Sequence, residues 1–199
     1  MTLSTQELET RLWSVADSLR ANSELTSAEY KSPVLGLVFL RFVDHKFTAV
    51  QAQLEGQQSE SSRRTIGRDD YVALNTIYLP TEARYDHLLQ LPEGADLGRA
   101  VSDAMEAIEN ENTDLRGILP RDYSRVTNPT LATLLRTFWE IPMDIEGDVF
   151  GRIYEYFLGK FAISEGQRGG EFYTPTSIVK LIVEIIEPYS GRIFDPASG

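Results

Sequence analysis

The sequence predicts a mainly α protein, in which an N-terminal helical bundle is followed by the first helix and first strand of an α/β domain. Before Gly147, apolar residues recur at helical spacing in most segments, with little convincing strand. After Gly147, two helices and a short apolar strand lead into a turn of small residues, the order in which many doubly wound α/β domains begin. A chain of 199 residues accommodates one domain and the start of another.

The first predicted helix spans residues 4–22. Ser4 and Glu7 have the spacing of a capping box, in which each side chain bonds a free backbone N–H of the first turn. Apolar residues then recur along one face: Leu8, Leu12, Val15, Ala16 and Leu19. This segment is therefore expected to be an amphipathic helix with one buried stripe.

The second predicted helix is the most apolar element of the chain. Thr26 and Glu29 repeat the capping signal, and Pro33 is expected in the first helical turn. Residues 34–54 are apolar on most of the helical circumference, which places this helix in the middle of a bundle. Gly36 either allows close packing at that point or is incidental.

Three shorter elements and a loop follow. Residues 56–70 have almost no apolar side chain, which is typical of a mobile surface loop. A short extended piece at 76–80 and a short helix at 82–91 are each ended by proline. The helix at 97–112 is amphipathic, with one apolar face: Leu97, Val101, Ala104, Met105 and Ile108.

A further helix at 128–140 is predicted to be capped by Asn128, with Pro129 in its first turn. The helix at 148–166 carries an aromatic stripe, which is expected to be core or an interface with the next domain: Phe150, Tyr154, Phe157 and Phe161.

The last helix, after a glycine-rich turn, is predicted to turn five side chains inward: Ile178, Leu181, Ile182, Ile185 and Ile186. Gly191 ends it, and Arg192, Ile193 and Phe194 form the predicted strand.

The composition is that of a soluble globular protein. Hydrophobic residues make up 42% and charged residues 25% of the chain, so a packed core is expected. The chain has no cysteine, which favours a reducing compartment. The N-terminus lacks a signal-peptide pattern, and no apolar run approaches the ~20 residues of a spanning helix. We therefore expect a cytoplasmic protein outside the membrane.

Charge and motif content exclude several classes of site. A formal net charge of −11 argues against nucleic-acid binding by this chain alone. Arg63, Arg64 and Arg68 could contact phosphate, but a solvated loop is the better interpretation. His45 and His87 lack companions at ligand spacing, so no metal site is predicted. Because no P-loop, nucleophile elbow or Ser-His-Asp order is present, no catalytic residue is predicted either.

Two segments could hold a small molecule. The small residues of Asp-Pro-Ala-Ser-Gly at 195–199 would let backbone amides approach a ligand at a strand end, although such a segment is commonly only a turn. In the segment 169–175, Phe172 or Tyr173 could stack on an adenine-like ring, and Thr174 could hydrogen-bond a ligand. Its alternative is a helix cap with a hydrophobic staple. Only one helix and one strand separate the two segments, so they could meet.

Several stretches together resemble the modification subunits of type I restriction-modification systems. AEYKSPVLGLVFLRFVDHKF, YLPTEARYDHLL and AMEAIENENTDLRGILPRDYSRV are similar to their N-terminal helical domain. GDVFGRIYEYFLGKFAISEGQRGGEFYTPTSIVKLIVEIIEPYSGRIFDPASG is similar to the entry into their catalytic domain. The resemblance implies a helical domain at 1–165 and, at 166–199, the start of a truncated Rossmann-like methyltransferase domain.

The resemblance also implies an activity and its partners. Such subunits transfer a methyl group from S-adenosylmethionine to adenine N6 in DNA, at a target chosen by a specificity subunit. They assemble with that subunit, with a second modification subunit and with a restriction nuclease subunit. The cofactor-binding residues implied by the match are Glu171, Phe172, Tyr173, Thr174, Pro175, Thr176, Asp195, Pro196 and Gly199.

The match has two departures from the family pattern. Ala197 and Ser198 replace residues that vary among small side chains, which should leave the backbone cradle unaltered. The family's Asn-Pro-Pro-aromatic motif, which receives the flipped adenine, is absent from the 199 residues, so they are expected to be inactive by themselves. The alternative is a non-catalytic helical module that binds other proteins, or the remnant of a decayed gene.

Overall fold

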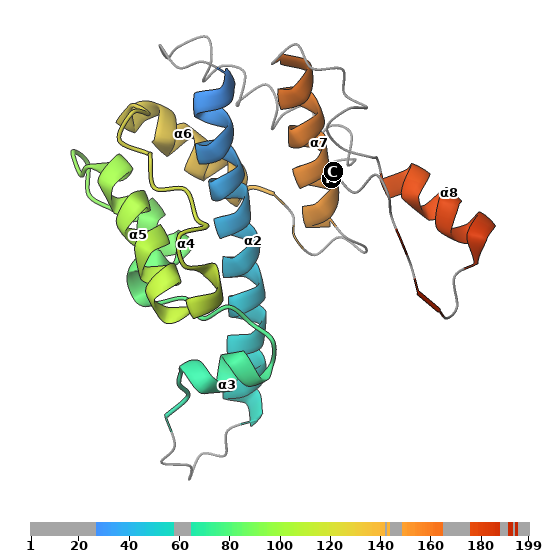
Figure 1. Cartoon of the computed structure of the whole chain (residues 1–199). Helices are drawn as coiled ribbons and strands as arrows, with labels where there is room; N and C mark the ends of the chain where they lie inside the picture. The colour runs from blue at the N-terminus through green and yellow to red at the C-terminus, as the bar shows by residue number, and fades with distance from the viewer. Residues whose placement is uncertain are drawn as a thin grey trace.

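The long helix α2 (Ser27–Gln57) forms the axis of the structure, a computed structural model that describes residues 27–57, 65–141, 143, 149–164, 176–187, 191, 192 and 194. Helices α3 (Arg68–Ala73), α4 (Tyr85–Leu89), α5 (Leu97–Glu111) and α6 (Asn128–Trp139) lie on one side of it, and α7 (Val149–Ser164) lies along the other (Figure 1). Two 3₁₀ turns, Thr81–Ala83 and Thr113–Leu115, complete the bundle. The prediction of a mainly helical first domain is confirmed.

The core is built around α2, as its apolar circumference predicts. Helices α3, α4, α6 and α7 all contact α2, whereas α5 packs on α6 and on the two 3₁₀ turns. Six α2 side chains are almost completely buried: Tyr30, Val34, Leu37, Val38, Leu40 and Val43. Because burial of one large apolar side chain stabilises a fold by about 1.5–3 kcal/mol, this helix organises the domain.

Helix α2 begins at Ser27, as the capping signal at Thr26 and Glu29 predicts. Pro33 lies inside the helix rather than in its first turn, so the prediction for Pro33 was wrong. Proline removes one backbone hydrogen bond of the helix. The burial of the nearby Val34 and Leu37, both 0% exposed, offsets the stability lost with that hydrogen bond.

The predicted loop at 56–70 is partly helical. Gly56 belongs to α2, and Arg68 starts α3. The Asp70 carboxylate accepts the Gly67 N–H at 2.9 Å, which caps α3, and Tyr71 stacks on Phe47 of α2 with ring centroids 4.3 Å apart. The burial of Tyr71 thus stabilises a helix at the polar end of this segment. Residues 58–64, including Arg63 and Arg64, lie outside the described residues.

The helices at 82–91, 97–112 and 128–140 are confirmed in slightly shorter form as α4, α5 and α6. Val101, Ala104, Met105 and Ile108 are buried as predicted. The cap of α6 was predicted wrongly, because its N-cap is Thr127. Asn128 instead accepts the Leu97 N–H at 3.1 Å and donates to the Ala95 carbonyl at 2.8 Å, so it joins α5 to α6.

The extended piece at 76–80 carries no strand assignment. Its backbone is paired by a side chain: Tyr78 N–H donates to Asn112 Oδ1 at 3.0 Å, and Asn112 Nδ2 donates to the Tyr78 carbonyl at 2.9 Å. The amide therefore supplies the donor and acceptor that a neighbouring strand would provide.

Helix α8 (Thr176–Ile186) lies apart from the bundle (Figure 1). Arg192 and Phe194 carry no strand assignment, and Ile193 lies outside the described residues. An isolated extended segment has no neighbour to complete a ladder, so the predicted strand is not observed in the part that is described. Among the described residues, no helix has the length and apolar content needed to cross a membrane.

Gly36 provides a test of packing around α2. A Cβ atom at this position would overlap the Tyr123 hydroxyl and Pro120 Cγ, so the glycine is needed for close approach of the 113–126 connection. Gly36→Ala is expected to destabilise the protein by about 1–3 kcal/mol, although alanine favours helix by about 1 kcal/mol. Urea unfolding measures the difference.

The matched control is Gly159→Ala in α7, where a Cβ would meet no atom within 4 Å. That variant is expected to gain up to about 1 kcal/mol from helix propensity alone. Equal stability changes at the two glycines would contradict the packing role of Gly36.

Candidate functional site

The predicted cofactor segments flank α8. Thr176 is the first residue of that helix, which agrees with the predicted helix start after the Thr-Pro pair. The other predicted cofactor residues lie outside the described residues: Glu171, Phe172, Tyr173, Thr174, Pro175, Asp195, Pro196 and Gly199. The roles of these residues therefore stay predictions.

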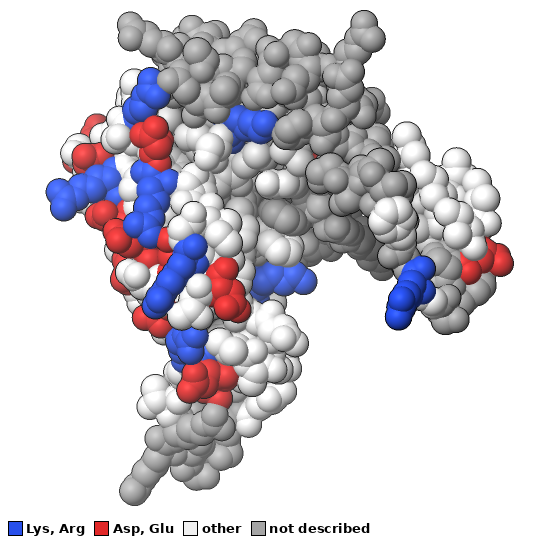
Figure 2. Space-filling view, viewed as in Figure 1, with Lys and Arg blue, Asp and Glu red and all other residues white. Residues whose placement is uncertain are grey.

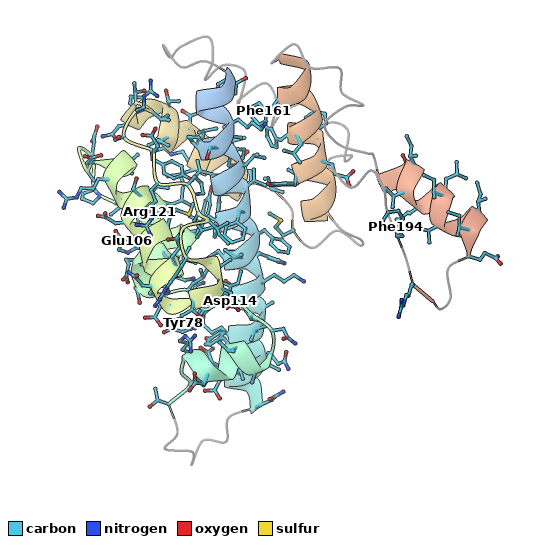
Figure 3. All side chains as sticks on the ribbon, viewed as in Figure 1. Tyr78, Glu106, Asp114, Arg121, Phe161 and Phe194 are labelled. Atoms are coloured by element: carbon cyan, nitrogen blue, oxygen red, sulfur yellow. The ribbon has the colours of Figure 1, made fainter. Side chains whose placement is uncertain are left out.

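Helix α8 exposes the apolar side chains that were predicted to turn inward. Ile178, Leu181, Ile182, Ile185 and Ile186 are 46–72% exposed, so that expectation does not hold in this structure. Val179 and Val183 are exposed as well, and Phe194 beyond the helix is 85% exposed (Figure 3). The polar residues of α8, which are Thr176, Ser177, Lys180 and Glu184, lie along one side, so the wide apolar face of the helix is the part that needs cover.

Helix α7 connects the bundle to the segment that carries α8. Ile153, Phe157 and Phe161 are completely buried, and Phe161 points toward α2, where it meets Tyr30 edge-on at 5.3 Å (Figure 3). Phe157 also meets Phe138 of α6, with centroids 6.2 Å apart. Of the two predictions for the aromatic stripe, core is confirmed for Phe157 and Phe161.

A buried carboxylate joins α2 to α4. Asp44 Oδ1 accepts from Arg84 Nε at 2.7 Å and from the Tyr85 N–H at 3.1 Å, and the Asp44 side chain is only 4% exposed. The remaining guanidinium nitrogens of Arg84 donate to Gln51 and Thr48 of α2. These hydrogen bonds offset the cost of burying the two side chains.

Arg41 of α2 holds the end of α6. Arg41 Nη2 lies 3.5 Å from the carbonyl oxygens of both Trp139 and Ile141, and its guanidinium carbon lies 4.7 Å from the centre of the Trp139 ring. Tyr85 stacks on the same ring and donates its hydroxyl to the Leu135 carbonyl at 3.1 Å. Burial raises the pKa of Tyr85 well above its usual value, so this hydroxyl stays a donor.

Glu109 performs a similar task for α5. The Glu109 side chain is 2% exposed and accepts a hydrogen bond from the Leu119 N–H at 2.8 Å. It also forms an ion pair with Arg121, and Arg121 forms a second ion pair with Glu106 at 3.1 Å (Figure 3). Burial by itself would raise the pKa of Glu109. Hydrogen bonds from the Gly117 and Leu119 backbone and from Arg121 outweigh burial and lower that pKa below 4.5.

The hydrogen bonds and ion pairs of these three polar clusters hold helices and connections together. Arg68, considered above for phosphate binding, donates to the Glu111 carbonyl at 2.6 Å and so ties α3 to α5. In the described part of the chain, no group of three metal-ligating side chains comes together. Sequence reasoning missed the roles of Arg41 and Asp44, whose signal was their position within the apolar segment 34–54.

Comparison with known families identifies the family of this chain. The family described as HsdM N-terminal domain matches residues 8–138, which include α2–α6. The family described as N-6 DNA Methylase matches residues 145–199, which include α7, α8 and both predicted cofactor segments. The chain belongs to the methylase (HsdM) subunit family of type I restriction enzymes.

Curated members of this family are similar over much of the chain. The type I restriction enzyme MjaIX methylase subunit of Methanocaldococcus jannaschii is 38% identical across 98% of the chain, which covers 38% of that relative. The HindI methylase subunit of Haemophilus influenzae is 39% identical across 61% of the chain, which covers 33% of that relative. The chain thus spans about a third of the length of these HsdM relatives.

The two family matches meet close to α7. By sequence, α7 falls within the N-6 DNA Methylase match that starts at residue 145. By packing, α7 belongs to the HsdM bundle, because α2 is the element that it contacts most. Helix α7 therefore couples the helical body to the methylase segment.

Substitutions on α8 test whether its apolar residues contribute to the stability of this HsdM chain. Leu181→Gln and Ile185→Glu, at 60% and 72% exposure, are expected to change the free energy of unfolding by less than about 0.5 kcal/mol and to reduce binding of a hydrophobic dye. Phe157→Ala in α7 is the contrast, with an expected loss of about 3–5 kcal/mol. A comparable loss on α8 would show that its face is covered.

Glu109→Gln tests the buried ion pair through pH. Because the pKa of Glu109 is lowered in the folded state, its stabilising contribution is complete above the ordinary pKa of 4.5 and is lost as pH falls through the lowered pKa. The variant is expected to be about 1–3 kcal/mol less stable at pH 7 and to lose less stability on acidification. Urea unfolding from pH 7 to pH 3 measures both.

The control for this experiment is Glu106→Gln, which alters the half-exposed partner of the same Arg121. A change of less than about 1 kcal/mol is expected there, since exposed pairs contribute little. Parallel pH curves for the wild-type chain and Glu109→Gln would contradict the assignment.

Proposed function

We propose that the chain is the N-terminal part of an adenine-N6 DNA methyltransferase subunit that uses S-adenosylmethionine. The observation that carries the proposal is the conjunction, in one chain and in order, of the HsdM N-terminal match and the N-6 DNA Methylase match. The wide, exposed apolar face of α8 supports it, because the first helix of an α/β domain packs such a face on the sheet.

The residues of the two predicted segments fit this cofactor chemically. Phe172 and Tyr173 offer ring faces for adenine, and Thr174 and Thr176 offer hydroxyl groups. Asp195, with Pro196 and Gly199, offers a carboxylate next to small residues, which suits the ammonium end of the molecule. Glu171 and Pro175 complete the first segment. When bound, S-adenosylmethionine supplies an electrophilic methyl group.

The helical body has an assembly role in this proposal. It docks to a specificity subunit, pairs with a second modification subunit and helps to hold DNA within a complex that also contains a nuclease subunit. The net charge of −11 supports this assembly role, because the cations that bind DNA phosphates would then come mainly from surfaces other than that of this chain. The 199 residues contain no Asn-Pro-Pro-aromatic sequence, so methyl transfer by these residues alone is not expected.

The direct test starts with the gene. Sequencing past the Gly199 codon is expected to find an open frame with an Asn-Pro-Pro-aromatic motif. The product of that frame, co-expressed with the specificity subunit of the same locus, is expected to incorporate labelled methyl groups into DNA at adenine N6. A stop codon directly after Gly199 would exclude catalysis by this product and favour a binding module.

Asp195→Ala in the complete product tests the cofactor assignment. Loss of one charge-assisted contact to the cofactor is expected to weaken S-adenosylmethionine binding at least about tenfold. Binding to the specificity subunit should stay unchanged, since Asp195 belongs to the methylase segment. Calorimetry with S-adenosylmethionine and a pull-down with the specificity subunit separate the two effects, and undiminished cofactor affinity would contradict the role of Asp195.

A further inference from the structure

Two grooves lie one after the other along the same helix, α2. The first has a volume of about 490 Å³ and lies between α2, the 115–120 connection and α7. The second has a volume of about 340 Å³ and lies between α2 and the segment after α3. The α2 residues that line the first groove are Lys31, Ser32, Leu35, Gly36 and Phe39; those that line the second are Phe42, Val43, Lys46 and Val50.

The α2 side chains of both grooves form one seam. Leu35, Phe39, Phe42 and Lys46 follow one another at steps of four, three and four residues, the spacing at which one helix presents a continuous stripe to another helix. Leu35, Phe39 and Phe42 are only partly buried, in contrast to the α2 residues of the core. This seam is thus a second apolar face of α2, distinct from the face buried in the bundle.

The rims of the seam are apolar too. Ile118, beside the first groove, is 67% exposed, and Leu74, beside the second, is 40% exposed. Neither residue is needed to close the core, since both leave much of their side chain in water. Exposed apolar side chains that gather along a groove mark a surface that binds another molecule.

The charge of the seam is positive, in contrast to that of the whole chain. Among the described residues that line the grooves, the charged one is Lys31 in the first groove and Lys46 in the second. Lys46 lies over the Phe42 ring, with its ammonium nitrogen 5.7 Å from the ring centre. Charged side chains of both signs gather instead on the α5 side of the molecule (Figure 2).

We propose that this seam docks an amphipathic helix of a partner subunit, which places two apolar anchors about eleven residues apart in the grooves and carries acidic residues beside them. The spacing follows from α2, because the grooves are centred near Leu35 and Lys46, about 16 Å apart along a helix that rises 1.5 Å per residue. Acidic side chains are complementary to Lys31 and Lys46, and helix-in-groove recognition uses anchors of this kind.

A second copy of this chain fits the seam poorly. Parallel pairing of two α2 seams sets each lysine against itself, and antiparallel pairing centred between the lysines sets Lys31 against Lys46. Like charges placed opposite one another oppose association. DNA fits no better, since one lysine per groove in an apolar lining does not form the cluster of cations that phosphates require.

The inference rests on the proposed assembly role, so the probe is the specificity subunit encoded at the same locus. Its affinity for the 199-residue chain is measured with Ile118→Glu and Lys46→Glu, each of which is expected to weaken binding at least about tenfold. The control is Arg99→Glu, which makes the same charge change as Lys46→Glu at a 79% exposed position on α5 and is expected to leave binding unchanged. Thermal unfolding verifies that all three variants fold.

Photo-crosslinking from position 118 identifies the partner segment. Crosslinks to a specificity-subunit helix with two apolar positions about eleven residues apart and flanking Asp or Glu support the proposal. Crosslinks between two copies of the chain, or wild-type affinity in both Ile118→Glu and Lys46→Glu, overturn the seam and leave the assembly role intact. If the wild-type chain does not bind the specificity subunit, the assembly role and the seam fail together.

Discussion

The structure depends on the burial of α2, and that burial depends on how its charges are satisfied. A helix that is apolar on most of its circumference can occupy the middle of a bundle only if each polar group that it carries inward finds a partner. Asp44 accepts hydrogen bonds from Arg84 and from the Tyr85 N–H, and Arg41 donates to the carbonyl oxygens of Trp139 and Ile141. The two charges thereby fix where α4 and α6 dock on α2.

Short connections are held by single side chains rather than by regular secondary structure. Asn112 pairs both backbone groups of Tyr78, Asn128 joins α5 to α6, and Glu109 binds the connection that packs over Gly36. Glu109 is buried and Asn112 is half-buried, so their hydrogen bonds are strong and a missing partner would be costly, whereas Asn128 is exposed. In the described residues of the bundle, small polar clusters therefore hold the connections in place, and no site for covalent chemistry is seen.

Function in this family is divided between parts of the chain that differ in how far they are covered. Helix α7 is anchored by Phe157 and Phe161 against α2 and α6, whereas α8, a few residues farther along, exposes its apolar side chains. The exposed seam of α2 places a second apolar surface on the same body.

The sequence by itself determined which segments are helices and that 34–54 occupies the centre, because helical periodicity is a local property of side-chain order. It also determined the family, through motifs in order, and proposed cofactor residues that the described structure does not reach. Only the tertiary structure decided that Arg68–Ala73 is helical, that Pro33 lies inside α2 and that Asn128 is a connector rather than a cap. These outcomes depend on contacts between residues distant in sequence, such as Tyr71 with Phe47 and Asn128 with Ala95, which no local pattern encodes.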